Sequence, residues 1–348
     1  MKRSLVAFVL SVLFLLSAPC FAEVFSLGPD LTNLETVSVG DPGNAGELSG
    51  GGYGPDRICG AVSYSYYIGK YEVTTAQYTD FLNHVAATDP YGLYNTNMWS
   101  SSLGCKIQQS GSPGSYIYSV ASDWANRPVN YVSYWDSCRF ANWLHNDQPA
   151  GPQGASTTED GAYYLNGYTG SDGRTIQRKA GWKWAVTSED EWYKAAYYKG
   201  STSNAYWDYP MQSDVPTVPS NDLPDSGNNG NFWQSDYSIG SPCYRTNVGE
   251  FGNSESHFDT FDQGGNVWEW NEAVTIYQYA PYVFRGVRGG AFDGKADYLL
   301  ASTRYDSATS LESSSVGFRV SSPIPEPSSL LMLGSGLLAL AGIIRRKR

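Results

Sequence analysis

Apolar side chains recur at helical spacing in three short stretches of the chain, and each stretch opens with a helix-start signal. In the first, Thr74 is followed three positions later by Gln77, which is the pattern of a capping box. Tyr78, Phe81 and Val85 then continue one apolar face. The pattern predicts helices over residues 74–85, 133–145 and 188–197.

Aromatic and β-branched residues predict a strand or hairpin over residues 63–73 and strands over 287–292 and 316–320, at both ends of the same region. Residues 88–127 and 200–258 have no sustained period and are rich in Gly, Ser, Pro and Asn, so we expect long loops there. No linker interrupts residues 61–322. The sequence therefore predicts one α+β domain over 61–322, preceded by an exposed lead-in of residues 23–60.

In the stretch from Gly264 to Trp270, small, aromatic and acidic residues stand close together. Its paired glycines allow backbone angles closed to other residues, and Trp268 and Trp270 place two large apolar side chains on one side of an extended segment. Glu269 stands between them. A carboxylate among aromatic rings needs an ion pair, hydrogen bonds or a cation, so this loop is the candidate functional centre.

The N-terminal residues predict export. Lys2 and Arg3 precede an apolar run, and small residues stand at Cys20 and Ala22. This order is that of a secretory signal peptide covering residues 1–22, with cleavage after Ala22.

The C-terminal residues form a three-part tail over residues 323–348. Pro325-Glu326-Pro327 is followed by an uncharged apolar stretch over 328–344 and then by four basic residues. The apolar stretch reaches the lower limit for a transmembrane helix, with the basic end in the cytoplasm. The tail resembles the PEP-CTERM sorting signal of Gram-negative bacteria, which implies processing by an exosortase-type enzyme; the alternative is an ordinary membrane anchor. The expected location is the cell envelope or extracellular matrix, with the chain anchored before the tail is cut.

Both ends are free of acidic residues apart from Glu326, so removing residues 1–22 and 328–348 leaves 17 Lys and Arg against 34 Asp and Glu. The net charge of the mature chain is then −17, compared with −11 for the whole sequence. Such an acidic chain repels phosphate backbones, which argues against nucleic-acid partners and favours divalent cations.

Four cysteines remain after the signal peptide is removed, and they are widely spaced: Cys59, Cys105, Cys138 and Cys243. An even number in an exported protein predicts two disulfides, with three possible connectivities. Neither these cysteines nor the three histidines have the spacing of a zinc site.

Five stretches, in order, resemble motifs of the sulfatase-modifying factor family, which includes the formylglycine-generating enzyme. They are Ile68 to Thr74, Arg127 to Ser133, Ser188 to Trp192, Gly265 to Trp270, and Arg288-Gly289-Gly290 with Gly317-Phe318-Arg319. The resemblance implies a variant of the C-type lectin fold with little regular secondary structure and with structural calcium.

The enzyme of that family binds copper(I) through two cysteines shortly after the Arg-Gly-Gly motif. Here residues 291–301 contain no cysteine, and none follows Cys243 anywhere in the chain. Ala291 also replaces the family's serine. Copper is therefore not expected, because site chemistry and not fold decides activity.

The calcium expectation is carried by different residues. By the resemblance, Asp262 and Glu269 would supply carboxylate oxygens, and Gly265 and Val267 backbone carbonyls, to one calcium ion. Asn231 would contribute to a second site. The alternative for Glu269 is a buried ion pair with an arginine, for which the candidates are Arg288, Arg304 and Arg319.

The sequence thus predicts an exported, non-catalytic domain of this family that binds a polysaccharide, such as an exopolysaccharide, or a protein. The alternatives are a formylglycine-generating oxidase, another redox enzyme that uses cysteines brought together by the fold, and a purely structural surface protein.

Overall fold

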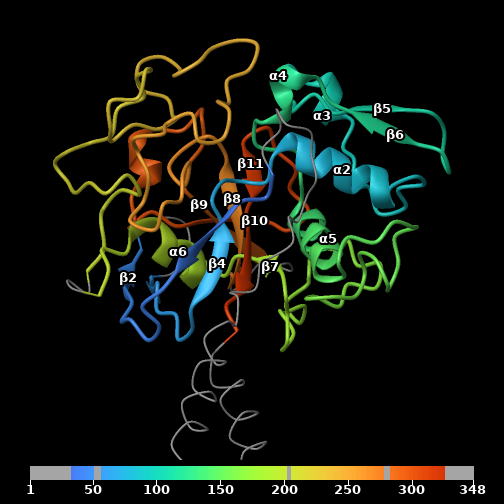
Figure 1. The fold of residues 1–348 in the computed structure, drawn as a ribbon, viewed down its shortest axis with the longest axis horizontal. Coiled ribbons are helices and arrows are strands. Elements are labelled where there is room, and N and C mark those ends of the chain that lie inside the picture. Colours follow the sequence, from blue (N-terminus) through green and yellow to red (C-terminus); the bar gives the residue numbers. More distant parts are fainter. Residues whose placement is uncertain (1–32, 51–55, 202–204, 278–282, 326–348) are drawn as a thin grey trace, which may run out of the picture.

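The computed structural model describes residues 33–50, 56–201, 205–277 and 283–325. Two four-stranded sheets lie at the centre of the described part, with helices and long loops around them (Figure 1). The longest described helix has 12 residues and the longest strand has eight. The predicted α+β fold with long loops is confirmed.

The first sheet has the order β1-β4-β12-β7, formed by Thr36–Val39, Tyr66–Gly69, Val320–Pro323 and Ala185–Val186. The predicted first strand appears as β4 at its centre, where the tyrosine- and isoleucine-rich sequence fits a buried pleat. β12 pairs with both β4 and β7 in antiparallel register. This sheet therefore joins the beginning, the middle and the end of the domain.

The segment expected to be an exposed lead-in contributes strands to the fold. β1 pairs with β4 along its whole length, and β2 (Glu47–Ser49) pairs with β3 (Arg57–Cys59). Val39 and Cys59 are buried. Its glycine, proline and aspartate content does not indicate strands, and β1 also depends on a partner outside the segment, β4.

The second sheet has the order β10-β9-β8-β11, formed by Tyr305–Ala308, Phe284–Arg288, Trp268–Thr275 and Val316–Phe318. The predicted strand over 287–292 ends at Arg288, because Gly289 and Gly290 have φ values of +97° and +76° and turn the chain away. The predicted strand over 316–320 is divided between β11 and β12. The central motif thus passes from a loop into β8.

Three capped helices surround the sheets, as predicted. They are α2 (Thr75–Val85), α5 (Tyr134–His145) and α6 (Glu189–Tyr197), and each begins with a complete capping box. In Figure 1, α2 and α5 lie on one side of the sheets and α6 on the other.

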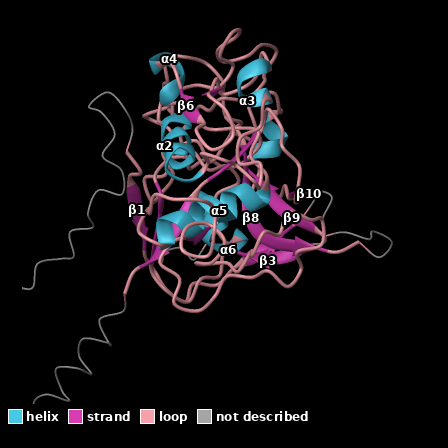
Figure 2. Ribbon diagram, turned by 90° about the vertical axis from the view of Figure 1, so that its right-hand side faces the viewer, coloured by secondary structure: helices cyan, strands magenta, loops and turns pink. Residues whose placement is uncertain are grey.

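Shorter elements lie around α2, as the turned view in Figure 2 shows for α3, α4 and β6. They are α3 (Asn97–Ser100), α4 (Ser122–Ala125) and the hairpin of β5 (Gln108–Ser110) and β6 (Ile117–Ser119).

The largest core cluster lies between the sheets and α2 and α5, and it is strongly aromatic: Phe81, Phe140 and Trp143 are fully buried there, with ring centroids 5.2–5.9 Å apart. Aromatic packing thus holds together a fold with few long elements.

Within the described residues no helix is long and apolar enough to cross a membrane. The predicted signal peptide and apolar tail lie outside those residues.

Candidate functional site

The loop before β8 is fixed by backbone contacts that require glycine. Gly265 has a φ of +105°, and a Cβ there would lie 2.3 Å from the carbonyl oxygen of Asn231. The Gly265 N–H donates to the Gly289 carbonyl at 2.9 Å, and the Asn266 N–H donates to the Asn231 carbonyl at 2.7 Å. The loop therefore joins the Arg-Gly-Gly turn to the long loop that contains Asn231.

Glu269 is fully buried, and both of its oxygens are hydrogen-bonded. Arg319 donates from Nε to Oε2 at 2.6 Å and from Nη2 to Oε1 at 2.7 Å, while Trp192 Nε1 donates to Oε2 at 2.7 Å. This bidentate ion pair is the strong form of a charge-assisted contact. Of the three arginines proposed for Glu269, the structure selects Arg319.

Arg319 extends this connection to two further segments. Its Nη1 donates to the Gly69 carbonyl at 2.8 Å, and its Nη2 donates to the Phe261 carbonyl at 2.9 Å. The Gly-Phe-Arg motif, the Trp-Glu-Trp motif and the end of β4 therefore meet at one buried guanidinium.

Asp262 lies half-buried on the loop that leads to this ion pair, with a φ of +62°. Its Oδ2 accepts the Gly249 N–H at 2.6 Å, and burial raises its pKa to about 7. On one side it lines a small cavity of about 10 Å³, the size of one water, together with Thr260, Gln263 and Gly264. The buried carboxyl of Glu72 interacts electrostatically with Asp262, and its oxygens have no hydrogen-bond partner among the described residues; burial raises its pKa well above the usual value.

The predicted calcium ligands fit the ion only in part. Asp262 lines a water-sized cavity, and Glu72, which interacts with it electrostatically, has two buried oxygens without a hydrogen-bond partner among the described residues; such oxygens suit a hard cation. Glu269 already uses both oxygens for Arg319 and Trp192, and a guanidinium repels a second cation. The backbone of Gly265 and Val267 lies between the two acids along the chain. Calcium at this set stays a prediction.

Asn231, the candidate for the second calcium site, lies on the neighbouring loop. Its Nδ2 donates to the Tyr244 carbonyl at 2.9 Å and to Asn266 Oδ1 at 2.8 Å. Its Oδ1 is buried and accepts no hydrogen bond from the described residues. This oxygen is a suitable cation ligand, but the described residues bring no group of three acidic, histidine or cysteine side chains together for a metal.

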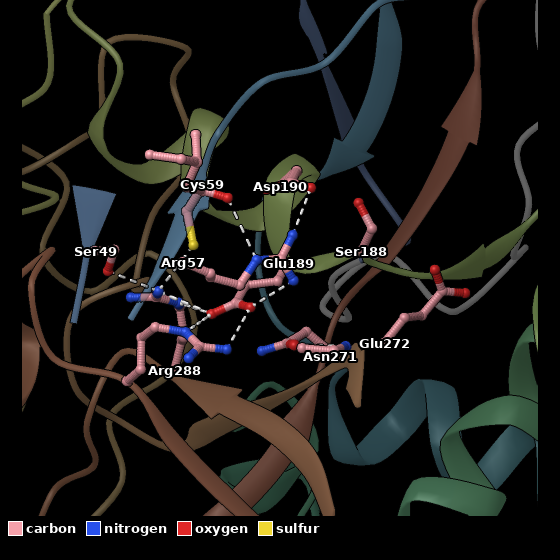
Figure 3. Close-up of polar contacts among 12 residues, drawn as sticks. Ser49, Arg57, Cys59, Ser188, Glu189, Asp190, Asn271, Glu272 and Arg288 are labelled. Carbon is pink, nitrogen blue, oxygen red and sulfur yellow. Dashed lines mark hydrogen bonds and ion pairs between the residues drawn. The ribbon is translucent and has the colours of Figure 1, made fainter. Parts of the chain in front are cut away.

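A second buried cluster surrounds Glu189 at the start of α6 (Figure 3). Its carboxylate accepts from Arg288 Nε at 2.8 Å, from Arg304 Nε at 2.6 Å and from Arg57 Nη1 at 3.0 Å. Burial alone would raise the pKa of Glu189, but these guanidiniums lower it to about 2. The cluster thus fixes the start of α6 to β3, β9 and the segment before β10.

The sequence alone does not reveal this cluster, because acidic residues directly after Ser188 also fit a helix cap and the helix dipole. Glu191 does cap, since Ser188 N–H donates to its Oε2 at 2.7 Å. Glu189 instead binds the arginine of the Arg-Gly-Gly motif. The signal that could have revealed it is the same arginine, which needs a buried acidic partner.

Residues 291–301, after Arg-Gly-Gly, correspond to the segment that holds the copper-binding cysteines in the family's enzyme. In this chain the segment contributes aromatic packing. It includes the 3₁₀ helix η1 (Ala296–Leu299), from which Tyr298 packs against Trp268 and Tyr305 with ring centroids 5.6 and 5.4 Å apart. Trp268 and Tyr305 are themselves 5.1 Å apart, and all three side chains are half-buried. We call Trp268, Tyr298 and Tyr305 the aromatic triad.

The prediction of two disulfides is wrong, because Cys59, Cys105, Cys138 and Cys243 are all free thiols. Three are buried in separate surroundings: Cys59 beside the Arg288 guanidinium, Cys105 against the Asn130 carbonyl, and Cys138 within α5. Ion pairs and aromatic packing already cross-link the long loops. The even cysteine number was therefore not evidence of pairing.

Comparison with known proteins agrees with the motifs. Three solved structures match most of the chain at low sequence identity. CarF is 18% identical, with 84% of this chain and 99% of that chain covered and a TM-score of 0.48. Treponema denticola variable protein 1 is 17% identical, with 84% of this chain and 96% of that chain covered and a TM-score of 0.49. PvdO from Pseudomonas aeruginosa is 16% identical, with 85% of this chain and 96% of that chain covered and a TM-score of 0.45. No curated protein matches the chain in sequence.

Family models match nearly all of the chain from β3 onward. The PEP-CTERM protein-sorting motif matches residues 323–348, which marks an exported protein of the Gram-negative cell envelope and implies processing by an exosortase-type enzyme. The model of the sulfatase-modifying factor enzyme 1-like domain matches residues 58–323. The fold and the motifs around Glu269 and Glu189 thus have a common explanation: the chain belongs to the sulfatase-modifying factor family.

Proposed function

We propose that this exported domain is a non-catalytic module that binds a polysaccharide or a protein outside the cell. The observation that supports it is the segment after Arg288-Gly289-Gly290, which places Tyr298 in the aromatic triad and contains no thiol. Half-buried rings offer flat faces to sugars and to apolar protein side chains. A polysaccharide is the first choice, because stacking on such faces tolerates many sugar residues.

The four thiols give little support to a redox enzyme. Burial raises the pKa of Cys59 to about 11 and that of Cys138 to about 12, so both stay protonated at neutral pH. Burial also raises the pKa of Cys105. Soft metals bind thiolates and not thiols, so a copper(I) pair would need a different environment.

The test combines turnover and binding on the purified mature chain. We expect no aldehyde when the copper(I)-treated chain is incubated with a cysteine-containing sulfatase peptide. We expect retardation in gels containing bacterial exopolysaccharide, weakened roughly three- to tenfold by Tyr298→Ala, because an aromatic contact contributes about 0.5–1.5 kcal/mol.

The matched control is Trp99→Ala, which removes an exposed ring on α3, away from the triad. It should leave the retardation unchanged. Aldehyde formation would reject the binding module in favour of the oxidase. An unchanged retardation with Tyr298→Ala would remove the triad from the proposal and direct the search to protein ligands.

We also propose that calcium binds beside Asp262. The support is the small cavity lined by this carboxylate and the two buried oxygens of Glu72, which have no hydrogen-bond partner among the described residues and interact electrostatically with Asp262. Glu269 would join the ion only by giving up part of its contact with Arg319. Such a site has a structural role here, since it would fix the loop in front of β8.

Calcium removal is therefore expected to lower the melting temperature. An ion present at 100 times its Kd stabilises the folded state by about 2.7 kcal/mol, and chelation abolishes this gain. Thermal unfolding with calcium, with magnesium at equal ionic strength and with a chelator measures the effect. Asp262→Asn should abolish the calcium response, whereas Asp222→Asn, on an exposed loop residue, should keep it. Equal melting temperatures with calcium and chelator would reject the site.

A further inference from the structure

A polar pocket opens between α5, the loop that precedes β7, and the strands β8 and β9. It encloses about 300 Å³, which is the lower end of the range for small-molecule sites, and Gln177 and Val274 are exposed at its mouth. The lining residues are Tyr134, Tyr163, Gln177, Arg178, Glu272, Val274 and Arg285. It shares no lining residue with the aromatic triad or the Asp262 cavity.

The buried base of the pocket carries a guanidinium without a carboxylate partner. Arg285 is 2% exposed, and its Nη1 and Nη2 donate to the carbonyls of Glu272 at 2.9 Å and Ile176 at 2.8 Å. Its Nε makes no hydrogen bond to a described residue, and no described carboxylate lies within ion-pair distance. A buried positive charge that contacts carbonyl dipoles and the faces of the Tyr134 and Trp135 rings, with no carboxylate partner, favours an anion nearby.

Tyr134 adds a second spare donor beside this guanidinium. The Arg285 guanidinium lies 4.6 Å from the centre of the Tyr134 ring, which is fully buried. Within the described chain the only hydrogen-bonding group beside the Tyr134 hydroxyl is the Cys138 thiol, which is a weak partner. Two buried donors without a strong partner next to one pocket are costly unless a ligand or water uses them.

The wall of the pocket offers an acceptor, the carboxylate of Glu272. Glu272 Oε1 accepts from Arg178 Nε at 2.9 Å and from the Tyr163 hydroxyl. The other end of Arg178 binds Glu191 at 2.7 and 2.8 Å, so its charge is already compensated. In Figure 3, Glu272 points away from the Glu189 cluster. Its carboxylate remains partly exposed at the pocket, where it can accept from a hydroxyl group.

We propose that this pocket binds a small carboxylate that also carries hydroxyl groups, of the uronic acid class. The ligand carboxylate would face Arg285 and Tyr134, and a ligand hydroxyl would donate to Glu272. A volume near 300 Å³ accommodates one sugar ring, and a guanidinium without an ion-pair partner, that of Arg285, discriminates an acidic sugar from a neutral one. The proposal goes beyond the binding role of the aromatic triad and does not require it.

Isothermal titration of the purified mature chain with D-galacturonate and D-glucose tests the charge preference. We expect saturable binding of galacturonate with one site per chain, and binding of glucose at least roughly tenfold weaker, because a charged hydrogen bond contributes about 1.5–3 kcal/mol. Lactate and oligogalacturonate test whether the bound carboxylate belongs to a free hydroxy acid or to a polymer. Preference for the oligosaccharide assigns the carboxylate to a polymer, and equal binding of lactate assigns it to a free hydroxy acid; both support the carboxylate site.

Two variants separate binding from folding. Tyr134→Phe removes an unsatisfied buried hydroxyl, so it should weaken galacturonate binding roughly fivefold without lowering the melting temperature. Its matched control is Tyr78→Phe, in which the lost hydroxyl donates to the Leu93 carbonyl at 2.8 Å in the core. This control should lower the melting temperature and leave galacturonate affinity unchanged.

Three results would overturn the proposal: no saturable binding of any probe, equal affinity for glucose and galacturonate, or unchanged galacturonate affinity in Tyr134→Phe. These results are distinct from failure of the proposed function. Aldehyde formation on the sulfatase peptide would remove the non-catalytic role and still leave galacturonate binding to be measured.

Discussion

Replacing Arg319 by methionine is expected to lower the free energy of unfolding by about 3–5 kcal/mol, because it leaves the buried carboxylate of Glu269 without its counter-ion. Both side chains of this pair are 0% exposed, so water cannot replace the guanidinium. The change also removes donors from the Gly69 and Phe261 carbonyls. Urea unfolding of the purified variant measures the loss.

The matched control is Arg174→Met, which breaks a surface ion pair with Asp172 at 2.7 Å. Exposed ion pairs contribute little to stability because water and salt screen them, so this variant should unfold almost as the parent chain does. The double variant Glu269→Met with Arg319→Met removes both charges and should recover part of the stability. A loss below about 1 kcal/mol for Arg319→Met would show that the Glu269 carboxylate has another stabilising partner.

Glu189→Gln is expected to have an effect of similar size, about 3–5 kcal/mol, for the opposite reason. The substitution removes the carboxylate that holds Arg57, Arg288 and Arg304 together. The three guanidiniums then repel one another. The acidic side chain that remains nearby is Asp190, which is bound to Arg57. Denaturant unfolding at pH 7 measures this effect, and Asp147→Asn, which breaks an exposed pair with Lys183, is the control.

The same variant should change the acid limb of the stability profile. The pKa of Glu189 is lowered from 4.5 to about 2, so its contribution is fully present above pH 4.5 and is lost as the pH falls toward 2. Glu191 has a similarly low pKa, near 2, and keeps part of the acid dependence in the variant. Glu189→Gln should therefore flatten the profile between these pH values only in part. An unchanged slope would argue against the charge network around Glu189.

The sequence predicted the helices well because their signals are local. Thr74 with Gln77, Ser133 with Asp136, and Ser188 with the acidic turn after it each place both halves of a cap within four residues. No distant partner is needed to recognise such a pattern. The same reasoning located the Trp268–Trp270 stretch as a buried extended segment, which became the start of β8.

The contacts of the candidate site depend on residues far apart in the chain and could not be assigned from sequence. Glu269 and Arg288 stand opposite each other on β8 and β9, yet they bind different partners. α6 packs against them and presents Glu189 to Arg288 and Trp192, three residues later, to Glu269. This helix contact decides that Arg319, and not Arg288, pairs with Glu269. The disulfide prediction, which rested on an even number of cysteines, was wrong for the same reason, since pairing requires proximity in space.

The position of β12 has a mechanical consequence. This strand is the last element before the sorting tail, and it lies between β4 and β7 within the first sheet. A pull on the tail therefore acts along the axis of β12, across hydrogen bonds that run perpendicular to it on both sides. All of these bonds share the load in shear, so the domain resists traction at its C-terminal end better than it would if an edge strand were peeled away.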